Sequence, residues 1–266
     1  MFFNFYLSCL RYCTLNSNKT KFMIICTKNI YNKHKHKLPT VLNFNQCTIH
    51  VTSEHKNLGV IFDSQLSFNT HHQTTIKNCY AILHSLKSIQ YDLSSKHKQT
   101  LIHSLIFSKL HYADIVTFPL NISWQKIYSR LYKQCYSFIH NKYVTTSCIF
   151  KFRQFTTATR FKYNLLCSAF KSFNLDGPDF LKLQPCINTL HNLRSSKQHL
   201  VSTIIADSSY AHAASTSFNN LPANIRNINT LQVFKTAITK FLLNNQHSYK
   251  DCQMLLPPID ITFSAK

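Results

Sequence analysis

The spacing of apolar residues changes near residue 67, and this change limits the possible folds more than any other feature of the sequence. Beyond it, apolar side chains recur every three or four residues, which places them along one face of a helix. These stripes predict amphipathic helices, with Ser94, Ser123 and Thr230 as N-cap residues and Pro222 in a first turn. The five stripes are Ile76, Cys79, Tyr80, Leu83 and Leu86; Leu101, Leu105, Ile106 and Leu110; Ile127, Leu131, Cys135, Phe138 and Ile139; Phe161, Leu165, Leu166, Ala169, Phe170 and Phe173; and Leu231, Phe234, Ile238, Phe241 and Leu242.

The residues before this change predict short strands instead. Residues 21–27 (KFMIICT) show the pattern of a buried strand. Residues 40–43 and 47–51 flank a polar turn and predict a hairpin. Residues 57–62 predict a third strand, in which Gly59 indicates a bulge or a close backbone approach.

The expected fold class is therefore α+β. A short N-terminal antiparallel β segment would be followed by a mostly α-helical region. We expect three parts, residues 1–66, 67–145 and 146–266. Residues 33–37 (KHKHK) predict a charged, solvated loop, and residues 183–200 show no clear period and predict a connector.

The near absence of glycine and glutamate excludes several classes of enzyme. The 266 residues include two glycines, Gly59 and Gly177, and one glutamate, Glu54. Glycine-rich dinucleotide and phosphate loops need several positions without a Cβ atom, and so does the nucleophile elbow of α/β-hydrolases. The presence of only one glutamate excludes two further classes of enzyme, the His-Glu-x-x-His zinc proteases and the glycosidases that pair two glutamates.

The balance of charge predicts a polyanionic partner. Lys and Arg number 30 against 9 Asp and Glu, so the net charge is +21, and 15 His add positive charge at lower pH. Nucleic acid is the first candidate for such a partner. The alternative is a bias toward lysine in AT-rich coding sequence, but that bias would raise glutamate as well, which is not the case.

Basic and aromatic residues alternate in one stretch, which marks it as a candidate nucleic-acid contact. Lys151 and Arg153 are followed by Arg160 and Lys162, with aromatic residues between them. Cations neutralise phosphates and aromatic faces stack on bases. The alternative is that the aromatic side chains belong to the core while the four charges are ordinary solvated ones.

Cysteine and histidine give no clear sign of a metal site. The ten cysteines contain no Cys-x-x-Cys pair, which favours a reducing, intracellular compartment, with the nucleus as one candidate, over a disulfide scaffold. The histidine pairs at 34 and 36 and at 71 and 72 are expected to be polar surface. No apolar run reaches the roughly 18 residues of a membrane span, and the first ten residues lack the features of a signal peptide, so we expect no membrane partner.

Catalytic carboxylates are hard to find in the sequence. Asp176 and Asp179 flank a Gly-Pro turn, which favours a turn role over a two-metal site. Tyr112 to Asp114 resembles the start of the Tyr-Ala-Asp-Asp turn of polymerases, but Ile115 stands where the second aspartate belongs. The segment also falls inside or at the end of a predicted helix, so we interpret the match as a coincidence.

Four segments, in order, resemble one known family. They match the patterns L-N-x-x-K-T-x-F, N-L-G-V-x-x-D-x-x-L-S-F, R-I-x-F-K with G-x-P-x-Y-L, and W-N-x-L-P-x-x-I-R with F-K. Phe180 and Phe218 replace the usual Tyr and Trp. On these segments the chain resembles the end of the palm, the thumb and the following region of LINE-type, jockey-like non-LTR retrotransposon reverse transcriptases. In this sequence the segments are residues 15–22, 57–68, 160–162 with 177–181, and 218–226 with 234–235.

The resemblance implies a truncated polymerase that keeps the parts that hold nucleic acid. In the family, the catalytic Tyr-Ala-Asp-Asp turn precedes the first matching segment by tens of residues, whereas fourteen residues precede Leu15 here. By resemblance, Asn57 and Gly59, with the two residues next to them, Leu58 and Val60, would lie at the primer-grip strand. Lys19 would match a lysine near the incoming triphosphate.

The expected function is that of an RNA-directed DNA polymerase fragment that is inactive alone and grips the backbone of a DNA or RNA–DNA duplex. No cofactor and no small-molecule substrate are expected on this chain, since Mg²⁺ would serve only an intact family member. One alternative is a non-functional retroelement relic that binds nothing specific. Another is a basic nucleic-acid-binding helical protein, and an active polymerase would need a carboxylate pair that the sequence does not supply.

Overall fold

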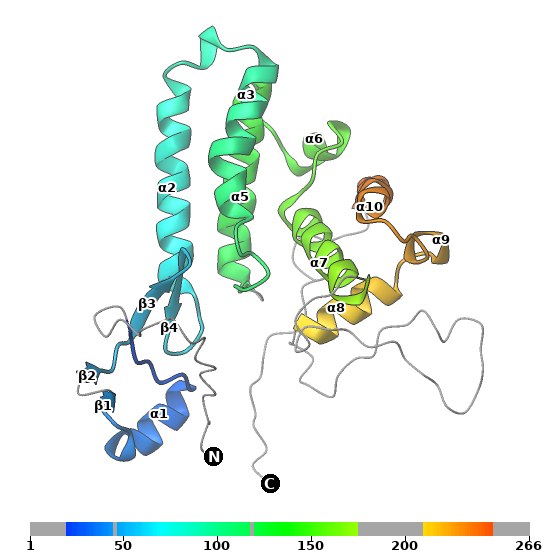
Figure 1. Ribbon diagram of the computed structural model, residues 1–266. Coiled ribbons are helices and arrows are strands. Elements are labelled where there is room, and N and C mark those ends of the chain that lie inside the picture. Colours follow the sequence, from blue (N-terminus) through cyan, green and yellow to red (C-terminus); the bar gives the residue numbers. More distant parts are fainter. Residues whose placement is uncertain (1–19, 45–46, 118–119, 175–209, 247–266) are drawn as a thin grey trace, which may run out of the picture. The chain divides into compact units, whose positions relative to one another are not determined.

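The computed structural model describes residues 20–44, 47–117, 120–174 and 210–246 (Figure 1). Lys19, Asp176, Asp179 and the expected connector at 183–200 lie outside these residues. The chain forms two compact units, residues 1–74 and 75–266. Short antiparallel strand pairs occur in the first unit and helices dominate the second, so the fold class is α+β, as the sequence predicts.

The described part of the first unit contains two hairpins. The expected one is confirmed: β1 (Val41–Phe44) pairs antiparallel with β2 (Cys47–His50), with Val41 opposite His50. The predicted strand at 21–27 is wrong, because this segment contributes only a bridge between Phe22 and Val51 and leaves Ile25 54% exposed. An apolar run without a neighbouring strand cannot complete a ladder of hydrogen bonds.

The charged segment at 33–37 is solvated as predicted, but it is not a loop. The helix α1 (Lys28–His34) continues into a 3₁₀ turn, η1 (Lys35–Lys37), and the side chains of both are exposed. The Thr27 hydroxyl caps α1 by accepting a hydrogen bond from the Ile30 N–H at 3.4 Å. This cap gives a short polar segment a defined start that charge alone does not reveal.

The segment predicted as a third strand contains a tight turn. Strand β3 (Glu54–Asn57) pairs antiparallel with β4 (Val60–Asp63), and Asn57 lies opposite Val60. Leu58 and Gly59 form the two-residue loop with φ angles of 45° and 86°. Two positive φ angles define a type I′ turn, so Gly59 serves a turn and not the expected bulge.

Asp63 organises the chain between β4 and helix α2 (Asn69–Lys87). Its Oδ1 accepts hydrogen bonds from the N–H groups of Gln65 and Ser67, both at 3.0 Å. Its Oδ2 accepts one from the Phe68 N–H at 2.6 Å. Burial alone would raise the pKa of this carboxyl, but the hydrogen bonds outweigh it and hold the pKa below its ordinary value.

The neighbouring histidines are buried, so the expectation that they form polar surface is wrong. His71 Nδ1 accepts a hydrogen bond from the Ile61 N–H at 3.5 Å, which ties the start of α2 to β4. Burial and the charge of Lys56 lower the pKa of His71, and burial and His71 lower the pKa of His72 to about 4. Both side chains therefore act as neutral packing groups at pH 7.

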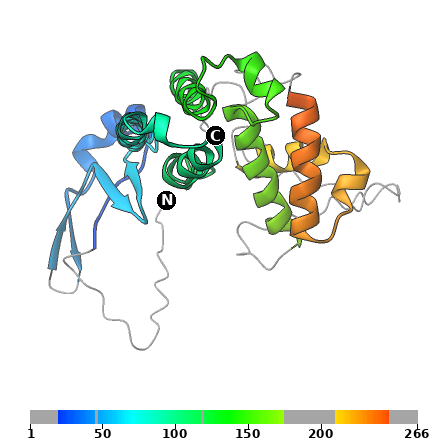
Figure 2. The same cartoon turned by 90° about the horizontal axis from the view of Figure 1, so that it is seen from above.

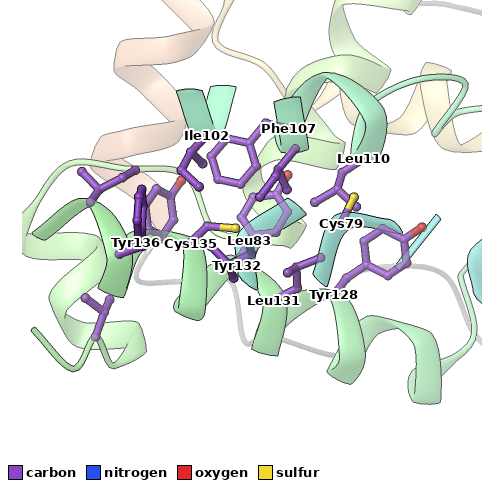
Figure 3. Close-up of a cluster of buried hydrophobic side chains, with 14 of the residues drawn as sticks. Cys79, Leu83, Ile102, Phe107, Leu110, Tyr128, Leu131, Tyr132, Cys135 and Tyr136 are labelled. Atoms are coloured by element: carbon purple, nitrogen blue, oxygen red, sulfur yellow. The ribbon is translucent and has the colours of Figure 1, made fainter. Parts of the chain in front are cut away.

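The helical unit begins with a three-helix bundle. The part of α2 within this unit, α3 (Ser95–Ile102) and α5 (Ile122–His140) share one hydrophobic cluster, whose members from these helices point toward one another in Figure 3. The Ser94 cap of α3 is confirmed, since its hydroxyl accepts from the His97 N–H. The predicted Ser123 cap is wrong, because Asn121 accepts from the Trp124 N–H at 2.9 Å.

A π-helical turn shifts the buried face after α3. This turn, η3 (His103–Phe107), leads into the short α4 (Ser108–Leu110), and a 3₁₀ turn, η2 (Gln90–Asp92), precedes α3. A π turn holds an extra residue, so the regular spacing of the predicted stripe fails there. Leu105 is 39% exposed, whereas Phe107, which the stripe omits, is buried.

The rest of the unit has its own hydrophobic cluster. Helix α7 (Thr157–Asn174) packs along α10 (Leu231–Asn245) and against α8 (Tyr210–Asn219) (Figure 2), and Phe170 stacks on Phe234 with ring centres 4.4 Å apart. The N-cap residue of α10 is Thr230, as predicted, and Pro222 directly precedes α9. The helices are α6 (Thr146–Lys151), α7 (Thr157–Asn174), α8 (Tyr210–Asn219), α9 (Ala223–Arg226) and α10 (Leu231–Asn245).

Lys98 lies inside the three-helix bundle although its side chain is cationic. It is 1% exposed, and its Nζ donates to Asn141 Oδ1 at 2.7 Å and lies 5.6 Å from the centre of the Phe138 ring. Asn141 ends α5 in the left-handed conformation, with φ of 52°. The amide oxygen and the ring therefore stabilise an ammonium that water does not reach.

We expect Leu58→Asn to stabilise the β3–β4 hairpin. Leucine resists positive φ, whereas asparagine tolerates it, and the Leu58 side chain is 83% exposed. A gain of about 1 kcal/mol would slow hydrogen exchange of the hairpin amides about fivefold. Gly59→Ala is the matched control and should speed the same exchange. Unchanged or faster exchange in Leu58→Asn would contradict the type I′ assignment.

We expect Asn141→Gly to lower the free energy of unfolding by about 1–2 kcal/mol in urea, followed by Trp124 fluorescence. Glycine keeps the left-handed conformation but removes the acceptor of the Lys98 ammonium. In a Lys98→Met background the same substitution should cost much less, because no buried charge is then left unpaired. Equal costs in both backgrounds would show that the hydrogen bond contributes nothing.

Candidate nucleic-acid interface

The site residues predicted from the sequence fall in both units. Asn57 and Gly59 are exposed at the β3–β4 turn of the first unit. Lys151 ends α6 and Arg153 follows it, and both side chains are exposed. Lys19 lies outside the described residues.

Arg153 and Arg160 are brought together by the helical unit. Both line a small pocket of about 200 Å³ between the η3 turn, α5 and α10, together with Phe155. Arg153 also donates to Asn244 Oδ1 near the end of α10 at 3.3 Å. Lys162 does not join them, because two residues along α7 amount to about 200° of rotation from Arg160. Lys162 is half-buried there, and burial lowers the pKa of its ammonium.

Arg160 is held between aromatic rings. Its guanidinium carbon lies 5.9 Å from the centre of the Phe155 ring and 5.1 Å from that of Tyr163. The Tyr136 hydroxyl donates to the Phe155 carbonyl at 3.0 Å and so fixes the segment that leads into α7. The Arg160 Nε is buried and has no hydrogen-bond partner among the described residues. The rings thus orient a cation whose donors are not all used.

Arg160 also lines a larger pocket of about 870 Å³, which the sequence did not reveal. His111 and residues 113–116 after α4, the middle of α7, the start of α8 and Lys235 of α10 line it. Asn164 donates to Asp114 Oδ2 at 2.5 Å across 50 positions of the sequence. The hydroxyls of Ser168 and Tyr210 are hydrogen-bonded at 2.7 Å and tie α7 to α8. We call this cavity the large pocket.

Asp114 has an environment that disfavours its charged form. Burial raises the pKa of its carboxyl, and the Asn164 amide and the Arg160 charge oppose that rise without cancelling it. The segment that contains it, Tyr112 to Asp114, follows the end of α4 and is not part of a hairpin, as expected. Asp114, which matches the first aspartate of the polymerase turn, is thus a polar side chain that lines the large pocket.

His111, which lines both pockets, forms a partly buried polar pair with Tyr132. The imidazole Nε2 and the tyrosine hydroxyl are hydrogen-bonded, and the Tyr132 ring stacks on Phe107 with centres 4.7 Å apart. Burial and the positive charge of Arg160, with a contribution from His103, lower the pKa of His111 to about 3. The imidazole is therefore neutral at pH 7 and adds no charge to the site.

Within the described ranges, no three His, Cys, Asp or Glu side chains gather closely enough to hold a metal ion. No described helix combines the length and the apolar character that crossing a membrane requires. Cations, hydroxyls and amides are among the groups that line the two pockets described above.

We expect the stability of the helical unit to fall as the pH drops from about 6.5 toward 3, in part because of His111. Its pKa is lower in the folded state than in the unfolded chain, so protonation favours unfolding throughout that interval. The contribution is at most about 1.4 kcal/mol per pH unit. Urea unfolding of His111→Gln, followed by Trp124 fluorescence, should show a shallower pH dependence than the unmodified chain, and identical slopes would contradict the assignment.

Comparisons with known proteins place the chain in no family. A scan against protein-family models finds no match, and searches of curated proteins and of solved structures find none either.

Proposed function

We propose that this chain is a C-terminal part of a LINE-type reverse transcriptase that grips the phosphate backbone of a DNA or RNA–DNA duplex and does not polymerise on its own. The observation that carries the proposal is a row of cations along the outer face of α5. Lys126, Arg130 and Lys133 follow one another at intervals of four and three residues. They therefore lie on one side of the helix over two turns, about 10 Å in length.

This row lies opposite the side of α5 that packs in the core. The side chains of Tyr128, Leu131 and Cys135 are buried, and they are about half a turn away from the cations. Lys126 and Arg130 are exposed and Lys133 is partly exposed. A rigid helix that presents three cations in line suits backbone contacts, which need charge and position but no base recognition.

Other exposed cations extend the same chemistry. One of them, Lys142, follows α5, whereas Lys151 ends α6 and Arg153 follows it. Against these positive charges, the described part of the helical unit contains two carboxylate side chains, Asp92 and Asp114. The exposed β3–β4 turn, with Asn57 and Gly59, corresponds by resemblance to the primer-grip strand. The proposal assigns no catalytic residue, because no aspartate pair of the polymerase type occurs in the sequence.

The cysteines support a reducing compartment for this activity. Five cysteines in the described part of the chain have free thiols, and three of these, Cys79, Cys135 and Cys167, are buried. Burial raises the pKa of the Cys79 thiol to about 11, although the charge of Lys109 opposes the rise. Such thiols behave as small apolar groups. We accordingly propose an intracellular location, with the nucleus as the compartment where a duplex would be met.

We expect the full chain to bind a short blunt-ended duplex with steep salt dependence. The triple substitution Lys126→Gln, Arg130→Gln, Lys133→Gln should make the slope of log K against log salt shallower by about 2.7, if each cation neutralises one phosphate. Fluorescence anisotropy on DNA and RNA–DNA duplexes, from low to high salt, measures this slope.

A second triple variant controls for net charge. Lys77→Gln, Lys96→Gln, Lys240→Gln removes the same charge from exposed positions outside the α5 row and should change the slope less. An equal effect of both variants would contradict a specific role for the row. Retention of duplex that does not change with salt would overturn the proposed function altogether, and so would measurable primer extension by the purified chain.

A further inference from the structure

The large pocket is lined by more positive than negative side chains. Arg160 and Lys171 of α7 and Lys235 of α10 all line it, against one carboxyl, Asp114. Burial raises the pKa of the Cys167 thiol, and the positive charges of all three side chains oppose that rise. Lys171 and Lys235 are neighbours of Phe170 and Phe234, whose rings stack, so these two cations lie at adjacent positions of α7 and α10. Arg160 lies eleven residues before Lys171, about 16 Å along the helix, and lines another part of the pocket.

Donors of hydrogen bonds also line the pocket. Arg160 is held by Phe155 and Tyr163, and its buried Nε has no partner among the described residues. The Ser168 and Tyr210 hydroxyls lie on the wall, and their mutual hydrogen bond fixes their positions. Cations and hydroxyls that are oriented in advance form the set of groups that binds a phosphate.

The segment after α4 contributes an apolar part of the wall. Ala113, Ile115 and Val116 line it, and Val116 is 51% exposed although its side chain is aliphatic. The amide of Asn164 on α7 donates to the carboxyl of Asp114 in this segment. An apolar surface with a few polar groups at its edge suits the flat face and the polar edge of a nucleobase.

We propose that the large pocket binds a nucleoside monophosphate unit, with the phosphate at Lys171 and Lys235 and the base against Ile115 and Val116. A volume of about 870 Å³ is within the range of small-ligand pockets. The unit is either a free nucleotide or an unpaired nucleotide at the end of a bound strand. The second source rests on the proposed function, because it requires the duplex to be held by the same chain.

The first test uses free ligands and the full chain. Calorimetry should give tighter binding of deoxyadenosine monophosphate than of inorganic phosphate or deoxyadenosine, since only the nucleotide fills both parts of the pocket. Lys235→Gln should weaken nucleotide binding by about tenfold or more, the usual effect of losing a charge-assisted hydrogen bond. Lys240→Gln on the same helix lies outside the pocket and should leave the affinity unchanged. Failure to bind the nucleotide, or equal effects of both variants, would overturn the inference.

The second test separates the two sources and the two proposals. A duplex with one unpaired terminal nucleotide should bind more tightly than its blunt counterpart, and Lys235→Gln should remove that gain while blunt-duplex binding persists. If the blunt duplex binds and neither the nucleotide nor the overhang does, the pocket assignment is wrong and the proposed function stands. If the nucleotide binds and no duplex does, the proposed function is wrong and the pocket takes a free nucleotide.

Discussion

The helical unit depends on the burial of one face of α5. That face packs against α2 and α3 through Leu131, Tyr132 and Cys135, each of them 3% exposed or less. Because its buried side chains occupy half of the helix surface, the basic residues can only lie on the other half. The same helix places the Tyr136 hydroxyl at the Phe155 carbonyl, next to Thr156, which caps the start of α7. The burial of α5 thus bears on the segment that leads to Arg160, a residue that lines both pockets.

Much of the helical architecture could be predicted because it depends on local periodicity. The stripes around Leu83, Leu131, Leu166 and Ile238 are buried, since each repeats over several turns and an amphipathic helix has one way to bury it. Prediction failed where the local geometry departs from the regular helix or strand. The π turn moved the buried face from Leu105 to Phe107, and the run at 57–62 concealed a two-residue turn behind an apolar pattern.

The candidate site was harder to predict, because its members are distant in the sequence. The pairing of Asp114 with Asn164 spans 50 residues, and that of Arg153 with Asn244 spans 91. No spacing rule connects such positions, which meet only when α7 packs against its neighbours. The basic stretch at 151–162 did identify Arg153 and Arg160 as a pair, since a short connection brings them close. It also included Lys162, because charge and sequence order do not tell which side of α7 a residue occupies.

The hydrogen bonds of Asp63 have a consequence for how the first unit folds. They join residues two to five positions apart, so the loop that each bond closes is very short and costs little entropy. Loops of this size close within tens of nanoseconds, well before helices distant in the sequence can collide and pack. The turn between β4 and the first residues of α2 can therefore form from local chemistry early in folding. The Asp-x-x-Leu-Ser-Phe pattern, which served as a sign of resemblance, is in physical terms a turn whose Asp63 hydrogen bonds need no residue outside it.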